Sequence, residues 1–75
     1  GQFVRGRLVS TTERSGRYTL TYQFKWRNRT YRSFQTSTAV ACRHLAIGDP
    51  VGVLFDGANP ANSTIVFRYR IWTSA

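Results

Sequence analysis

The chain has 75 residues, and its 11 Lys or Arg against 3 Asp or Glu give a formal net charge of +8. A chain of this length forms one small domain near the lower limit for independent folding. A single cysteine excludes an internal disulfide, and no apolar run approaches the roughly 20 residues that span a bilayer.

The first predicted strand covers Gln2–Thr12, where apolar and polar residues alternate imperfectly. Gly6 lies inside this strand, and a glycine there indicates either a bulge or the close approach of another backbone. The polar residues 13–17 predict a turn that ends the strand.

The second predicted strand, Tyr18–Arg27, carries the sharpest pattern in the chain. Every second position from Tyr18 to Trp26 is apolar, and the positions between them are polar. Such strict alternation predicts a strand with one buried face and one solvated face.

A hairpin is expected directly after this strand. Asn28–Arg29 fits a two-residue loop, which pairs Trp26 with Tyr31 and Lys25 with Arg32. An arginine in the left-handed conformation at the second loop position costs about 1–2 kcal/mol. A longer loop is therefore the alternative.

The segment after the third strand is ambiguous. Its alanine content favours one or two helical turns near residues 38–46, ended by Gly48. A long polar turn over residues 56–63 is expected to separate the last two strands. The third, fourth and fifth strands are predicted over Thr30–Ser37, Pro50–Phe55 and Thr64–Trp72.

Five to six closely spaced strands predict an all-β fold, either a small antiparallel barrel or a strongly curved sheet. One barrel-like domain is expected over residues 2–72. The absence of Met and the strand-like sequence near the C-terminus predict that this domain is cut from a longer chain. The core is expected to consist of Leu8, Leu20, Tyr22, Phe24, Trp26, Tyr31, Val51, Val53, Phe55, Ile65 and Phe67.

Over about residues 4–66 the order of landmarks resembles a family of small bacterial modules known only as a domain of unknown function. The landmarks are Gly6-Arg7-Leu8-Val9, the aromatic run 18–24, Tyr31, and residues 48–63, which read GDPVGVLFDGANPANS. The family signature is G-x-x-V-x-V-x-Y-D-P-x-N-P-x-x-S, from which Phe55 and Gly57 depart. The resemblance implies an all-β fold beside transmembrane helices in the parent protein, and it implies no catalytic residue.

The residue types used in catalysis are scarce. Cys42 and His44 are two positions apart, which separates their side chains on a helical turn and leaves them about 7 Å apart on a strand. One cysteine and one histidine are too few for a zinc site. Glu13, Asp49 and Asp56 are the only acidic residues, and Asp49 and Asp56 are expected to accept backbone N–H groups in turns. We therefore expect no enzyme activity, no cofactor, no metal and no small-molecule substrate.

The basic residues are the candidate functional surface, because the net charge favours anionic partners. If the first and last strands pair, the arginines on both form one stripe. The leading hypothesis is a non-catalytic module of a bacterial membrane-associated protein that contacts anionic lipid or an acidic protein. The alternative is a barrel that binds single-stranded nucleic acid, with guanidinium on phosphates and bases stacked on rings. The candidate contacts are Arg5, Arg7, Lys25, Arg27, Arg29, Arg32, Arg68, Arg70 and Trp72.

Overall fold

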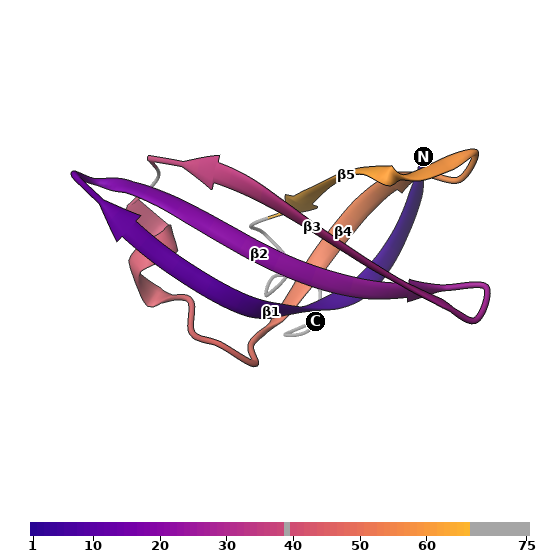
Figure 1. The fold of residues 1–75 in the computed structure, drawn as a ribbon, viewed down its shortest axis with the longest axis horizontal. Coiled ribbons are helices and arrows are strands. Elements are labelled where there is room, and N and C mark those ends of the chain that lie inside the picture. The colour runs from indigo at the N-terminus through magenta and orange to yellow at the C-terminus, as the bar shows by residue number, and fades with distance from the viewer. Residues whose placement is uncertain (39, 67–75) are drawn as a thin grey trace, which may run out of the picture.

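The computed structural model describes residues 1–38 and 40–66, and within these ranges five antiparallel strands form one sheet that curls into a nearly closed barrel (Figure 1). The sheet order is β3-β2-β1-β4-β5. The all-β prediction is confirmed, and so is a short helical turn near residues 38–46. The elements are β1 (Gln2–Arg14), β2 (Arg17–Trp26), β3 (Arg29–Ser37), the 3₁₀ helix η1 (Val40–His44), β4 (Pro50–Asp56) and β5 (Asn59–Val66).

β1 is the central strand, and it bends so that its two halves pair with different neighbouring strands (Figure 1). Residues 2–7 pair with β4, whereas residues 6–14 pair with β2. Gly6 lies in the overlap, where an added Cβ would be 2.7 Å from the Gln23 carbonyl oxygen and 2.8 Å from Val53 Cγ2. The predicted close approach at Gly6 is confirmed. The bulge lies further along, between Leu8 and Ser10.

The core fills the inside of the curled sheet. The apolar face of β2 points inward, as its alternation predicted, and Tyr22 is fully buried at its centre. The Tyr22 hydroxyl is 2.7 Å from Ser63 Oγ, so the one polar atom of this ring has a hydrogen-bond partner. The predicted core is confirmed for its described members, with Trp26 and Tyr31 partly buried, and Phe67 lies outside the described residues. The buried residues are Leu8, Leu20, Tyr22, Phe24, Cys42, Val51, Val53, Phe55 and Ile65.

The loop of the β2–β3 hairpin differs from the prediction by one position. Arg27 and Asn28 form the two-residue loop, both with positive φ (51° and 64°), and Trp26 pairs with Arg29. This register sets Phe24 opposite Tyr31, with ring centroids 5.5 Å apart. It also avoids a like-charge cross-strand pair between the basic side chains of β2 and β3. The aromatic contact and the charges therefore select a register that the loop residues alone do not favour.

The predicted long turn between the last two strands is wrong. Gly57 and Ala58 alone form the turn, and β5 begins at Asn59. The three extra residues are absorbed by a register shift between Phe55 and Asp56. Pro60 fits inside β5 because it is one of these three residues, which have no partner in the β4–β5 register, so its missing N–H removes no bond from the ladder.

A seam runs between β3 and β5, the two edges of the sheet, and the side chain of Gln35 bridges it. Gln35 Oε1 accepts hydrogen bonds from the Ile65 N–H at 2.7 Å and from the Thr64 hydroxyl at 2.9 Å. A single side-chain amide on β3 thus joins the two edges that a closed barrel would join by backbone pairing.

Replacing Gln35 with Ala is expected to destabilise the fold by about 1–3 kcal/mol, because the Ile65 N–H loses its acceptor. Gln35→Glu is the matched control, since a carboxylate can accept both bonds and should keep most of the stability. Urea unfolding midpoints measure both effects. An alanine variant with the midpoint of the parent chain would show that the bridge contributes nothing.

Candidate functional site: the outer basic face

The strand register places basic side chains in one row across β3, β2 and β1. Arg7 pairs with Gln23, which pairs in turn with Arg32. These residues point outward because their neighbours along the strands, such as Leu8 and Phe24, point into the core. Arg7 and Arg32 are both exposed, and two strand spacings separate them by about 10 Å.

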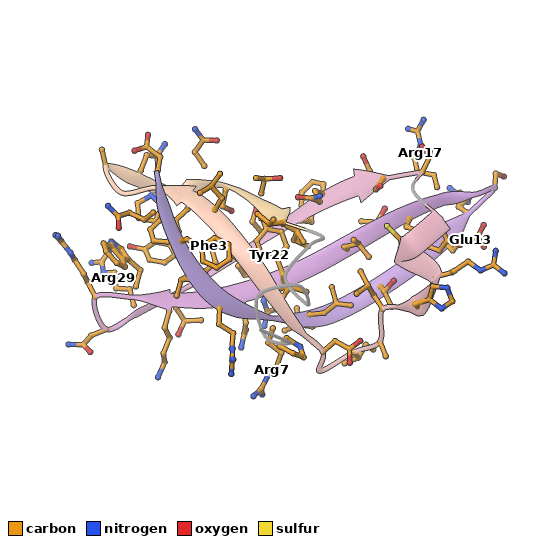
Figure 2. The ribbon with its side chains drawn as sticks, turned by 180° about the vertical axis from the view of Figure 1, so that it is seen from behind. Phe3, Arg7, Glu13, Arg17, Tyr22 and Arg29 are labelled. Atoms are coloured by element: carbon orange, nitrogen blue, oxygen red, sulfur yellow. The ribbon has the colours of Figure 1, made fainter. Side chains whose placement is uncertain are left out.

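A second row lies beside the first, towards the tip of the β2–β3 hairpin. Lys25 pairs with Thr30, and Arg5 pairs with Gly52 on β4. Figure 2 shows Arg7 pointing away from the sheet, whereas Tyr22 lies between the strands. We call the four cations of these two rows the outer basic face, and they are Arg5, Arg7, Lys25 and Arg32.

The acidic residues do not share these rows. Each of the three acidic side chains accepts a backbone N–H in a turn, which the sequence predicted for Asp49 and Asp56 but not for Glu13. These carboxylates are therefore committed to local structure, and the outer basic face keeps its positive character. The pairs are Glu13 with the Gly16 N–H (2.6 Å), Asp49 with the Ala46 N–H (2.9 Å) and Asp56 with the Ala58 N–H (2.9 Å).

The other predicted contacts lie apart from this face. Arg27 stacks on Trp26, with its guanidinium carbon 5.2 Å from the ring centroid. Arg29 lies near the tip of the β2–β3 hairpin, away from Arg7 (Figure 2). Arg68, Arg70 and Trp72 lie outside the described residues.

The predicted stripe joins Arg5 and Arg7 to Arg68 and Arg70, and the last two lie outside the described residues. At Arg5 and Arg7, β1 pairs with β4, and β5 lies on the far side of β4. Within the described residues, the structure assembles the basic residues across β1, β2 and β3.

Apolar side chains flank the outer basic face on both sides. Phe34 is 66% exposed and follows Arg32 by two residues on β3. Phe3 and Leu54 form an exposed cross-strand pair next to Arg5. The sequence prediction did not single out Phe34. Because side chains alternate along a strand and Tyr31 points inward, Phe34 three positions later points outward. The site therefore combines positive charge with exposed apolar surface.

Cys42 and His44 differ in their exposure to solvent. Cys42 lies within η1 and is buried in the core, whereas His44 at the end of η1 is exposed. Among residues 1–38 and 40–66, no group of three His, Cys, Asp or Glu side chains could hold a metal ion. The thiol therefore contributes to packing as a small apolar group.

Comparison with known families matches residues 1–70 to a domain of unknown function, DUF3592. No curated protein and no solved structure matches the chain. The expectation of a domain-of-unknown-function family is confirmed at this level, and the match brings no activity with it.

Proposed function

The chain belongs to the DUF3592 family, whose function is unknown, and we propose that it is a non-catalytic module that contacts anionic lipid through the outer basic face. The observation that carries the proposal is the convergence of Arg5, Arg7, Lys25 and Arg32 on one exposed surface of β1, β2 and β3. Each Lys or Arg near an anionic membrane surface contributes about 1 kcal/mol of attraction.

The exposed apolar side chains support a membrane surface as the partner. Phe34 on one flank and the Phe3–Leu54 pair on the other can enter the headgroup region while the cations meet the lipid phosphates. Among the described residues no helix is long and apolar enough to cross a bilayer. The proposal places the module in a bacterial membrane-associated parent protein, as the resemblance of residues 4–66 implies.

A vesicle-binding experiment tests the proposal. The double variant Arg7→Gln/Lys25→Gln is expected to bind anionic vesicles about 30-fold more weakly than the parent chain, because it loses about 2 kcal/mol of attraction. The control is Arg14→Gln/Arg17→Gln, which removes the same charge at the β1–β2 turn and should lose much less. Co-sedimentation at physiological salt, with neutral vesicles in parallel, measures both.

Two results would contradict the proposal. One is the absence of binding to anionic vesicles near physiological salt. The other is an equal loss in the two double variants, which would mean that net charge acts without a specific face.

Single-stranded nucleic acid is the second candidate, because the exposed ring of Phe34 lies beside Arg32. Stacking of a base on an aromatic ring contributes about 1–3 kcal/mol. If this candidate is correct, Phe34→Ala weakens oligonucleotide binding measured by fluorescence anisotropy, and affinity falls steeply with salt. Oligonucleotide binding without vesicle binding would replace the lipid proposal.

A further inference from the structure

A hollow of about 420 Å³ lies within the outer basic face. Its walls come from β1, β2 and the start of β3, and no acidic side chain lines it. We call it the β1–β2 hollow. The lining residues are Arg5, Gly6, Arg7, Gln23, Phe24, Lys25 and Thr30.

Three of the four cations of the outer basic face line this hollow. Arg5 and Arg7 are two residues apart on one side of β1, and Lys25 stands on the neighbouring strand β2. A guanidinium group offers two parallel N–H donors to a pair of oxygens, and an ammonium group adds a point charge. All three cations line the same hollow, so an anion that enters it is surrounded by positive charge.

Two neutral side chains complete the lining. Gln23 Oε1 accepts a hydrogen bond from Arg32 Nη2 at 3.3 Å, which leaves the amide nitrogen of Gln23 as a donor. The hydroxyl of Thr30, opposite Lys25, supplies a further donor. Arg32 therefore contacts the lining of the hollow through this hydrogen bond to Gln23.

This donor set fits a phosphate monoester better than a phosphate diester. A monoester presents three terminal oxygens and a charge of about −1.5 to −2 at neutral pH. A diester presents two such oxygens and one negative charge, and both of its ester arms must leave the hollow. The monoester therefore offers one more terminal oxygen and more negative charge to the two guanidinium groups and the ammonium group.

We infer that the β1–β2 hollow recognises the phosphate monoester of a lipid headgroup. The inference rests on the proposed function, because the surface presenting the headgroup is the anionic membrane that the outer basic face contacts. The module then distinguishes lipids by headgroup chemistry, in addition to responding to total charge.

The test compares two sets of vesicles matched in surface potential, one with phosphatidic acid as the monoester and one with phosphatidylglycerol as the diester. The parent chain is expected to bind the phosphatidic acid vesicles about tenfold more tightly. Arg7→Lys keeps the charge but loses the paired donors, so binding to phosphatidic acid should weaken more than binding to phosphatidylglycerol, and the preference should disappear. Arg14→Lys, at the β1–β2 turn, is the matched control and should keep the preference.

The outcomes separate the inference from the proposed function. Equal binding to the two matched vesicles would overturn the inference and leave the proposed function standing, whereas binding to neither would overturn both. Two competition arms address other sources of phosphate. Displacement from phosphatidic acid vesicles by inorganic phosphate at millimolar concentration would assign the hollow to the free anion, and displacement by a single-stranded oligonucleotide would assign it to nucleic acid. Either result would overturn the lipid assignment.

Discussion

Replacing Phe24 with Ala is expected to destabilise the fold by about 3–5 kcal/mol, which is close to the whole stability of a small domain. Phe24 is 3% exposed and lies at the centre of the aromatic cluster. Its ring centroid is 5.0 Å from that of Phe55, 5.5 Å from that of Tyr31 and 6.4 Å from that of Tyr22. Truncation removes a large buried area and leaves a cavity that three rings cannot fill without moving.

Phe34→Ala is the matched control, because it makes the same chemical change on the strand beside β2. Phe34 is 66% exposed, so its truncation should alter the free energy of unfolding by less than about 0.5 kcal/mol. Denaturant unfolding of both variants, followed by far-ultraviolet circular dichroism, gives the comparison. Similar losses at the two positions would contradict the inward and outward assignment of their faces.

The second large effect is expected at Gly6, where Ala should cost at least about 2–3 kcal/mol. The added Cβ would lie 2.7 Å from the backbone oxygen of Gln23, which cannot turn away as a side chain could. β1 pairs with β2 and β4 at this position, so it cannot move from one neighbour without pressing on the other. The strands must separate, and hydrogen bonds on at least one side weaken.

Gly57→Ala is the control for this substitution. A Cβ at Gly57 would meet only the exposed side chain of Gln2, at 3.2 Å from its Cγ, and that side chain can shift. Thermal unfolding should show a clear decrease in midpoint for Gly6→Ala and little change for Gly57→Ala. A Gly6→Ala variant as stable as the parent chain would mean that β1 is not held between its two neighbours.

Much of the fold could be predicted because the strongest pattern is local. The inward face of β2 can be predicted from the alternation of apolar residues between Tyr18 and Trp26 alone. It requires no knowledge of which strands lie beside β2. The carboxylate roles of Asp49 and Asp56 are equally local, since each binds an N–H within three residues. Such features follow from a few neighbouring residues.

The hairpin register could not be predicted in the same way. A loop at 27–28 and a loop at 28–29 both leave Tyr31 on the inward face, so the apolar pattern does not distinguish between them. The choice depends on the ring contact of Phe24 with Tyr31 and on the charges that become cross-strand neighbours. These interactions are non-local and appear only once two strands are paired.

The candidate site depends on non-local pairing still more. The sequence indicated that Arg5, Arg7, Lys25 and Arg32 alternate outward, but it did not indicate which strands lie side by side. Within the described residues β4 lies between β1 and β5, so Arg5 and Arg7 share a surface with Lys25 and Arg32. The polar lining from Gln23 and Thr30 likewise required the register before it could be recognised.

The division of β1 between two neighbours also affects how the chain can fold during synthesis. β2 and β3 follow β1 directly in the sequence, so these three strands can form a meander early. Residues 2–5 have no strand partner until β4 has been synthesised. Until residues 50–56 have left the ribosome, residues 2–5 form an open strand edge that carries Phe3. Nascent chains of this protein therefore pass through a stage in which they can associate with one another or require a chaperone.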